Sequence, residues 1–207
     1  MSDSITGGKT VVIDYQTGNL NSVCKALRAV GADVSIATTP EGLRNAARIV
    51  LPGVGHFSST GCLQDSGVAD ALREQVAGGT PFLGICVGLQ WLFGGSTEAP
   101  GVSGLGIFAE TCERFPSNVK SPHVGWNALE RVGESRLLDG LEDSPYVYFT
   151  HSYRAPRVSA TTAVTHYGGE FTAIVERENW MAVQFHPEKS GEAGLTILEN
   201  FLRVSAC

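Results

Sequence analysis

The fold is decided by residues 81–93, which read PFLGICVGLQWLF. The first half of this stretch is a short apolar run of the kind that forms a buried strand, and the second half has apolar residues at helical spacing. Cys86 stands at the break between the two halves, with Gly84 and Gly88 two residues to either side. This is the pattern of a nucleophile elbow with cysteine in the position of the nucleophile. It predicts a tight turn from strand to helix, whose flanks have no room for side chains.

Such an elbow gives a cysteine two properties. It lifts the sulfur out of the sheet, and it puts the sulfur at a helix N-terminus, where the positive end of the dipole favours thiolate. The backbone N–H of Val87 would then point to a place where an oxyanion could form. The alternative is that Cys86 is a small buried hydrophobic residue, as free cysteines in apolar runs usually are. The elbow pattern alone leaves both interpretations open.

Length and composition indicate a globular protein with one core. The chain has 207 residues, 43% of them hydrophobic, so we expect a single domain over residues 1–207. Residues 1–9 lack the apolar core of a signal peptide, and we expect them to form a flexible tail. The formal net charge of −6 disfavours a general nucleic-acid-binding role. No run of apolar residues is long enough to span a bilayer.

The cysteines are an odd number, widely spaced, and form no C-x-x-C pair. They therefore suggest neither a disulfide framework nor a zinc site. A reducing, cytoplasmic location fits this pattern best. The five residues are Cys24, Cys62, Cys86, Cys112 and Cys207.

The first half of the chain alternates strand-like and helix-like segments, which is typical of a parallel sheet with helices on both faces. In such sheets, sites gather at the carboxyl ends of the strands. Residues 14–19, residues 52–55 and Cys86 all follow expected strands, so we expect them to be neighbours in space. The expected strands are 10–14, 32–37, 48–51 and 82–85, and the expected helices are 21–30, one that begins at Pro40, and 68–77.

After Gly104 the strand-like runs come closer together, and turn pairs at 168–169 and 178–179 separate several of them. This pattern predicts antiparallel strands. The expected fold class is therefore α/β, with a mostly parallel central sheet flanked by helices and an antiparallel extension in the C-terminal half. The expected strands are 105–108, 146–150, 160–166, 171–175 and 181–185. A last helix at about 192–204 has an apolar face made of Leu195, Leu198, Phe201 and Leu202.

The second informative stretch is residues 181–189, which read MAVQFHPEK. An alternating strand ends at His186, and Glu188 follows two residues later, with Pro187 fixing the backbone between them. A catalytic thiol needs a base and a group that orients the base. His186 can take the proton from Cys86, and Glu188 can hold the imidazole in one tautomer. Either residue alone would more often be a structural histidine or a surface charge, but beside an elbow cysteine they indicate a catalytic triad.

Two segments resemble those of class I, triad-type glutamine amidotransferases: GICVGLQ from Gly84 and QFHPEKS from Gln184. Four more narrow the resemblance to the glutaminase subunits of imidazole glycerol phosphate synthase, an enzyme of histidine biosynthesis. They are DYQTGNLNSV from Asp14, PGVG from Pro52, PHVGWN from Pro122 and YFTHSY from Tyr148. The resemblance covers nearly the whole chain after the first nine residues.

The resemblance implies a role for each matching position. Cys86 would attack the side-chain amide of glutamine, His186 would act as base and then as acid to the leaving ammonia, and Glu188 would orient His186. No cofactor and no metal are implied. The backbone groups of the oxyanion hole would be those of Val54, Gly55 and Val87. The residues that hold the substrate would be Gly53, Gln90, Glu98, Ser152 and Tyr153.

The resemblance also implies a partner. In this family the ammonia passes into a separate cyclase subunit, a (β/α)₈ barrel, where it joins a phosphorylated ribulosyl aminoimidazole carboxamide intermediate. The chain is too short to contain such a barrel as well. We therefore expect a heterodimer. The interface residues on this side would be Asn19, Trp126, Tyr148 and Lys189.

Two positions depart from the family pattern. Gln16 stands where glycine is usual after the Asp-Tyr pair, in the loop near the expected partner face. Val87 stands where leucine is common, which changes little because the backbone N–H is the group expected to act.

Three alternatives remain open from the residues. A glutaminase subunit of pyridoxal phosphate synthesis shares the triad, but the HVGWN segment is not expected there. A catalytically silent binding protein of the same fold would not need an intact Cys86, His186 and Glu188. A papain-like protease has a different local cysteine signature, and the third residue of its triad is asparagine.

Overall fold

The computed structural model describes residues 8–16 and 18–204. The tail expected at residues 1–9 therefore lies almost entirely outside the described residues, and Cys207 lies outside them too. Within the described part, none of the helices is both long and apolar enough to cross a membrane.

A central sheet of eight strands organises the fold. Its members are β1 (Thr10–Ile13), β2 (Val34–Ala37), β3 (Arg48–Leu51), β4 (Phe82–Ile85), β8 (Glu130–Arg131), β11 (Thr161–His166), β12 (Glu170–Arg177) and β13 (Trp180–Val183). Their order is β2-β1-β3-β4-β13-β12-β11-β8. Each pairing from β2 to β13 is parallel, and each pairing from β13 to β8 is antiparallel. The predicted fold class is confirmed.

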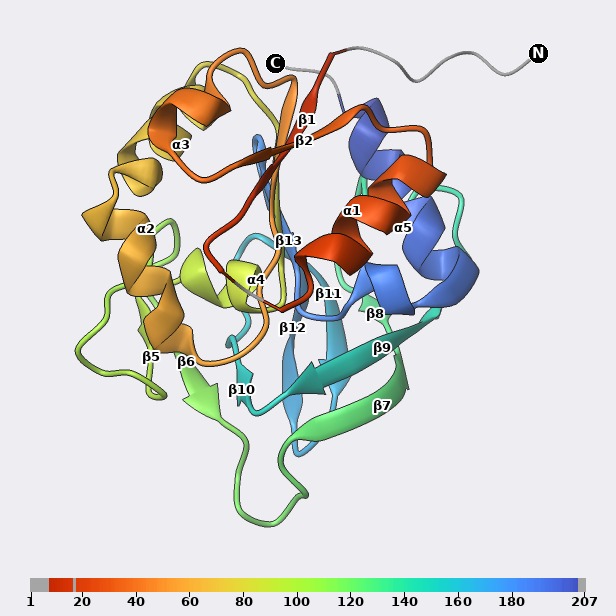
Figure 1. Cartoon of the computed structure of the whole chain (residues 1–207). Coiled ribbons are helices and arrows are strands. Elements are labelled where there is room, and N and C mark those ends of the chain that lie inside the picture. The colour runs from red at the N-terminus through yellow and green to blue at the C-terminus, as the bar shows by residue number, and fades with distance from the viewer. Residues whose placement is uncertain (1–7, 17, 205–207) are drawn as a thin grey trace.

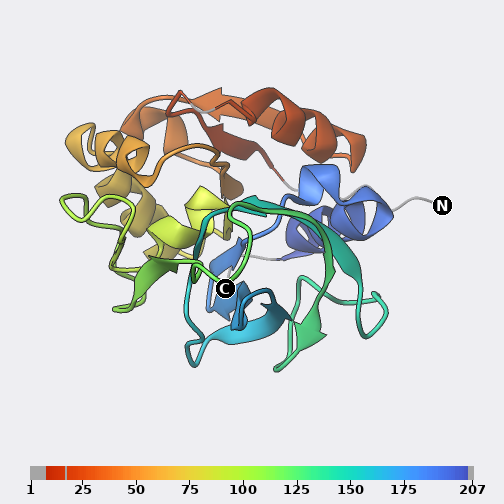
Figure 2. The same ribbon diagram turned by 90° about the horizontal axis from the view of Figure 1, so that it is seen from below.

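Helices cover both faces of this sheet. Figure 1 shows α1 (Leu20–Ala29) and α5 (Gly191–Arg203) on one face, and α2 (Gly61–Asp65) and α3 (Val68–Ala77) on the other. The view from below in Figure 2 shows the same layers. Helix α5 buries Ile197, Leu198 and Phe201, whereas Leu195, expected on its apolar face, is 37% exposed. The helix expected from Pro40 is a short 3-10 helix, η1 (Pro40–Leu43).

Two smaller sheets lie beside the main one. One has the order β10-β6-β5, with β5 (Gly95–Ser96), β6 (Thr111–Arg114) and β10 (Tyr153–Arg154). The other pairs β7 (His123–Ala128) with β9 (Tyr146–His151) in antiparallel fashion. Figure 1 shows β7 and β9 crossing in front of the C-terminal strands of the main sheet.

Two strand predictions for the second half need correction. Residues 105–108 form no strand, because their backbone N–H groups bond to carbonyls at the end of the preceding helix: Leu105 to Trp91, and Phe108 to Leu92. The run at 181–185 belongs to the half expected to be antiparallel, and β13 is antiparallel to β12, but on its other side it pairs in parallel with β4. This pairing joins the two halves of the chain and brings residue 186 to the same edge of the sheet as residue 86.

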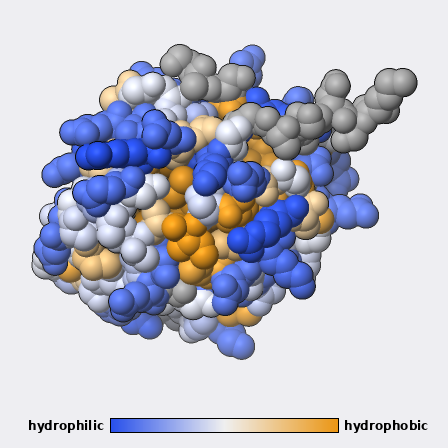
Figure 3. All heavy atoms as spheres, turned by 45° about the horizontal axis from the view of Figure 1, so that its top comes forward, coloured by the Kyte–Doolittle hydropathy of each residue, from blue (hydrophilic) through white to orange (hydrophobic). Residues whose placement is uncertain are grey.

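Exposed apolar side chains gather on the small β7–β9 sheet. Three of the five large hydrophobic residues exposed in the described chain lie there, namely Val124, Trp126 and Tyr146. A fourth is Ile36, on the edge strand β2. Figure 3, a view tilted by 45° from that of Figure 1, shows a hydrophobic area bordered by hydrophilic side chains. Exposed apolar surface of this kind commonly marks interaction sites.

Candidate active site

Cys86 joins β4 to the short helix α4 (Val87–Trp91). Its backbone angles, φ 55° and ψ −103°, lie where residues with side chains are rarely found. A Cβ atom on Gly84 would stand 2.6 Å from the carbonyl oxygen of Gly88, and one on Gly88 would stand 2.4 Å from that of Leu51. The predicted strand–turn–helix is confirmed, and close backbone packing is the reason for both glycines. Backbone strain of this kind concentrates at functional sites.

His186 and Glu188 form a buried pair at the same edge of the sheet. Nδ1 of His186 is 2.8 Å from Oε1 of Glu188, and neither side chain is exposed to solvent. The 3-10 helix η3 (Pro187–Lys189) turns the backbone so that both side chains meet. Nδ2 of Asn19 donates a second hydrogen bond to the same carboxylate oxygen, over 3.2 Å. The carboxylate is therefore held from two sides.

The electrostatics of this pair involve Cys86. Burial lowers the pKa of His186, but the neighbouring Cys86 and Glu188 raise it more, and the net pKa lies above its ordinary value. Burial raises the pKa of the Glu188 carboxyl, but the hydrogen bond and charge of His186 lower it more, and the net pKa lies below its ordinary value. The arrangement favours a charged imidazolium between a carboxylate and a sulfur.

A small cavity of about 230 Å³ lies next to the sulfur. Its wall brings together most of the residues that the sequence predicts for the oxyanion hole and for substrate binding. His151 lines the wall too, and the HSY segment that it begins was expected to touch the substrate. Sequence reasoning did not single out two further lining residues, Pro122 and Thr150. The predicted residues on the wall are Val54, Gly55, Cys86, Val87, Gln90, Glu98, Ser152 and Tyr153.

Gly53, the remaining predicted substrate residue, packs beneath this wall. A Cβ atom there would stand 2.5 Å from Oη of Tyr15 and 2.7 Å from Cβ of Val87. The side chains of Gln90 and Glu98 are both held by the backbone. Nε2 of Gln90 donates to the carbonyl oxygen of Tyr153 over 2.9 Å, and Oε2 of Glu98 accepts from the N–H of Phe57 over 2.8 Å.

Sequence reasoning missed Gln184, which is fully buried between Gln90 and Cys86. Its Nε2 donates to the sulfur of Cys86 over 3.6 Å. A signal was present, because Gln184 precedes His186 by two residues in an alternating run. Such residues lie on the same side of an extended chain.

The four residues expected at the partner interface do not all lie on the surface. Trp126 is 55% exposed and meets Tyr148 edge to face, with ring centroids 6.0 Å apart. Nζ of Lys189 lies 5.9 Å from the centroid of the Tyr148 ring. Asn19 is only 5% exposed, and its side-chain amide donates a hydrogen bond to the carboxylate of Glu188. Trp126, Tyr148 and Lys189 form one surface, whereas Asn19 contacts the buried pair of His186 and Glu188.

Gln16 lies in the loop between β1 and α1, with φ 68°. This is the left-handed region that favours glycine, the residue that the family usually has at this position. The N–H of Gln16 donates to Oδ1 of Asp14 over 2.8 Å, and this bond supports the turn. The loop therefore adopts a conformation suited to glycine although it carries glutamine.

Among the residues that the structure describes, no cluster of His, Cys, Asp and Glu side chains is arranged to hold a metal ion.

Comparisons with known proteins define the class. The family described as "Glutamine amidotransferase class-I" matches residues 11–204. The crystal structure of a glutamine amidotransferase shares the fold, with a TM-score of 0.72, 21% identity, and 92% of this chain and 98% of that chain covered. PurLQS from Thermotoga maritima has a TM-score of 0.77 and 18% identity, with 95% and 98% covered. The chain belongs to the class I glutamine amidotransferases.

More similar relatives narrow the family. The imidazole glycerol phosphate synthase subunit HisH of Methanothermobacter thermautotrophicus is 47% identical over 194 residues, which cover 93% of this chain and 97% of the relative. The HisH subunit of Aquifex aeolicus is 45% identical over 199 residues, with 94% and 96% covered. Within the class, the chain is a member of the HisH family of imidazole glycerol phosphate synthase subunits.

Proposed function

We propose that Cys86, His186 and Glu188 are the triad with which this glutaminase subunit of imidazole glycerol phosphate synthase hydrolyses glutamine to glutamate and ammonia. The observation that carries the proposal is the juxtaposition of a strained elbow thiol, a buried His–Glu pair and a cavity at one sheet edge. A thiol, a base and an orienting carboxylate are the parts that nucleophilic catalysis requires. We also propose that the chain acts as one domain.

The chemistry follows from these positions. The proton of Cys86 passes to His186, which becomes the imidazolium, and the thiolate sulfur then attacks the side-chain carbonyl carbon of glutamine. The oxyanion that forms accepts hydrogen bonds from the backbone N–H of Val87 and from the loop at Val54 and Gly55. His186 returns the proton to the amide nitrogen, the C–N bond breaks, and ammonia leaves a thioester on Cys86.

Water completes the cycle. His186 takes a proton from the water as it attacks the thioester carbonyl, and the second oxyanion uses the same backbone donors. The C–S bond then breaks, glutamate leaves, and His186 returns its proton to the sulfur of Cys86. Glu188 remains ionised throughout and keeps the imidazole in one orientation.

The substrate is assigned to the cavity beside Cys86. Gly53 lets the loop approach Tyr15 and Val87 closely, and a side chain at this position would push the loop out of place. Gln90, Glu98, Ser152 and Tyr153 all line this cavity, and Gln90 is hydrogen-bonded to the backbone of Tyr153. We assign to these residues the amino-acid end of glutamine, because polar groups that converge on a small cavity fix a ligand's orientation.

We assign the surface of Trp126, Tyr148 and Lys189 to a separate cyclase subunit, a (β/α)₈ barrel of the cytoplasm that receives the ammonia. Exposed aromatic residues are favoured interface anchors, because they bury a large area with few rotatable bonds. The surface is directly connected to the site, since the N–H of His186 donates to the carbonyl oxygen of Tyr148 over 2.9 Å. Lys189 follows Glu188 by one residue, and it would pair with an acidic residue of the barrel.

The partner is expected to control the rate. The loop at residues 52–55 contains two glycines, and Gly55 has φ 100°. Such a loop can present its peptide groups in two orientations, of which one supplies the oxyanion donor. The isolated chain should therefore be a poor glutaminase, and it should become active with the ligand-loaded cyclase.

Reconstitution with the cyclase subunit of the same organism tests the proposal. The chain alone should release little glutamate, and the complex with bound cyclase ligand should release glutamate and cyclised product in equal amounts. Trp126→Ala should weaken association or release glutamate in excess of product, and Lys189→Ala should reduce stimulation without unfolding the chain. Absence of glutamate release in the loaded complex would refute the proposed activity.

A further inference from the structure

A chain of three hydrogen bonds leads from the cavity wall to the sulfur of Cys86. Nε2 of Gln90 is 2.9 Å from the carbonyl oxygen of Tyr153 and 3.2 Å from Oε1 of Gln184. Nε2 of Gln184 is 3.6 Å from Sγ of Cys86. Gln90 and Gln184 are both buried, so water does not compete for these bonds. The chain connects α4, β10 and the segment after β13.

The direction of this chain follows from its first member. The carbonyl oxygen of Tyr153 can only accept hydrogen bonds, so Gln90 must turn its NH₂ group toward it. The second N–H of that group then reaches Gln184, which must offer its oxygen. This leaves the NH₂ group of Gln184 facing Cys86. A backbone carbonyl two side chains away therefore determines that the sulfur receives a hydrogen-bond donor and not an acceptor.

A buried donor has two effects on a sulfur. It favours the thiolate over the thiol, because a hydrogen bond to the charged form stabilises that form. It also fixes the rotamer of the cysteine, since the donor has one favourable direction of approach. His186 also interacts with this sulfur, but in the proposed triad it gives and takes protons, whereas the amide of Gln184 keeps its protons throughout the cycle.

We propose that Gln184 is a positioning residue, which holds the sulfur of Cys86 and stabilises its thiolate through an amide N–H whose direction Gln90 and Tyr153 determine. The inference rests on the proposed function of Cys86 as nucleophile. It assigns to Gln184 no contact with the substrate.

The test is the rate at which iodoacetamide alkylates each cysteine of the full-length chain, followed by mass spectrometry as a function of pH. The chain supplies its own controls. Cys62 is exposed and serves as the reference thiol. Cys86 is 3% exposed but lines the cavity, through which the reagent reaches it. Cys24 and Cys112 are buried, and an increase in their labelling reports opening of the fold. The main variant is Gln184→Met, which keeps the length of the side chain and removes the amide.

In Gln184→Met, alkylation of Cys86 at pH 7 should slow by on the order of tenfold, as expected for the loss of a hydrogen bond to a charged group. The pH profile of Cys86 alkylation should move to higher pH, and Cys62 should be unaffected. Gln184→Glu should slow Cys86 more, because a carboxylate opposes a thiolate. Gln90→Met should act in the same direction, because Gln184 is then free to turn its oxygen toward the sulfur.

If labelling of Cys24 or Cys112 shows that Gln184→Met is unfolded, Gln90→Met takes its place in the comparison. An unchanged Cys86 profile in a folded variant overturns the inference. In the complex with the cyclase, Gln184→Met should lower kcat and leave KM within about twofold. The reason is that Gln184 does not contact the substrate, so the residues that bind glutamine are unchanged. A wild-type complex that releases no glutamate contradicts the proposed function instead, so the two failures are distinguishable.

Discussion

Nδ1 of His186 and Oε1 of Glu188 are 2.8 Å apart, and both side chains are completely shielded from solvent. In Glu188→Gln, the amide keeps the shape of the carboxylate but loses its charge and can stabilise the wrong tautomer of the imidazole. The kcat for glutamine hydrolysis by the complex should fall by on the order of 10²–10⁴. Glu192→Gln, an exposed change at the start of α5, is the matched control and should leave kcat unchanged. A wild-type rate in Glu188→Gln would remove Glu188 from the triad.

Two further histidines make stability depend on pH. Burial lowers the pKa of His123 to about 4 and that of His151 to about 3. The unfolded chain therefore binds more protons below pH 6.5, and stability should fall as the pH drops from there toward 4. The slope should reach about 1.4 kcal/mol per pH unit for each histidine.

Urea unfolding at pH 7.5 and pH 5.5 measures this slope. His123 stacks on Tyr167, with ring centroids 4.0 Å apart, so His123→Phe keeps an aromatic ring at this place. This variant should lose less stability than wild type between the two pH values. His166→Gln, at an exposed histidine, should behave as wild type. An equal loss in wild type and His123→Phe would show that His123 is not the cause.

The elbow glycines should be intolerant of any side chain. Gly88→Ala puts a methyl group 2.4 Å from the carbonyl oxygen of Leu51, so the backbone must shift. We expect the free energy of unfolding to fall by about 1–3 kcal/mol, as in other overpacked sites. Gly101→Ala is the control, because a Cβ there meets no atom within 4 Å, and it should change stability by less than about 0.5 kcal/mol. Equal stability of the two variants in urea unfolding would contradict the packing of the elbow.

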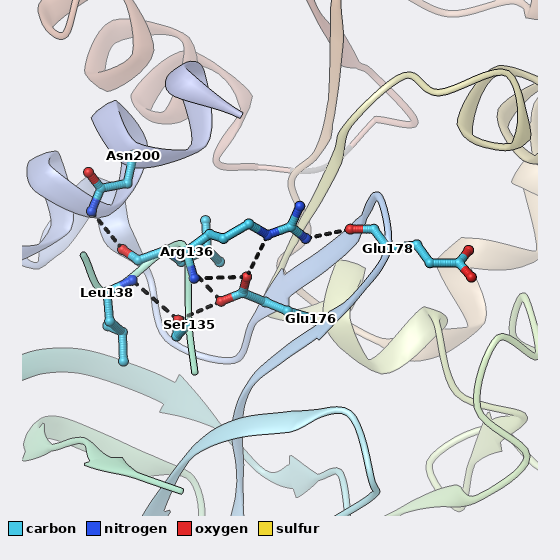
Figure 4. A network of polar contacts seen from close by, with 7 residues as sticks. Ser135, Arg136, Leu138, Glu176, Glu178 and Asn200 are labelled. Atoms are coloured by element: carbon cyan, nitrogen blue, oxygen red, sulfur yellow. Dashed lines mark hydrogen bonds and ion pairs between the residues drawn. The ribbon is translucent and has the colours of Figure 1, made fainter. Parts of the chain in front are cut away.

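Glu176 ties a loop to the main sheet (Figure 4). Its carboxylate accepts hydrogen bonds from the hydroxyl of Ser135, from the N–H groups of Arg136 and Leu137, and from Nε of Arg136. Asn200 of α5 holds the other side of the same loop through the carbonyl oxygen of Leu137. The loop is therefore fixed between β12 and α5.

Glu176→Gln should destabilise the fold by about 1–3 kcal/mol, because the new NH₂ group would face donors that it cannot bond. Glu199→Gln is the control, since its ion pair with Arg203 is exposed and 3.8 Å long. That variant should change stability by less than about 1 kcal/mol. Urea unfolding measures the free energy of unfolding of both variants. An unchanged value for Glu176→Gln would mean that the loop does not depend on the carboxylate.

Local patterns predicted the elements that are defined by their own sequence. The strands at 48–51 and 82–85 and the helix at 68–77 have the predicted bounds, because each is an apolar run or period between turn signals. Strand β7 was not predicted: its sequence HVGWNA contains glycine and polar residues, and its partner β9 stabilises it. The apolar run at 105–108 has the pattern of a strand, but its N–H groups donate hydrogen bonds to carbonyl oxygens at the end of α4.

The same distinction holds for the site. The proposed roles of Cys86, His186 and Glu188 follow from local motifs. The contacts of Gln184 and Asn19 do not, because each joins elements that are distant in sequence. Asn19 was predicted at the partner interface. Its hydrogen bond to Glu188 depends on how the start of α1 packs against η3. No local pattern contains that information.

Glutamate formation from glutamine by the ligand-loaded complex, measured with wild type, Cys86→Ala and Cys62→Ala, tests the central proposal most directly. Cys86→Ala should release no glutamate, while the same complex should still form cyclised product when ammonium salts replace glutamine. Cys62→Ala, at an exposed thiol, should match wild type. Glutamate release by Cys86→Ala at the wild-type rate would contradict the assignment of Cys86 as the nucleophile.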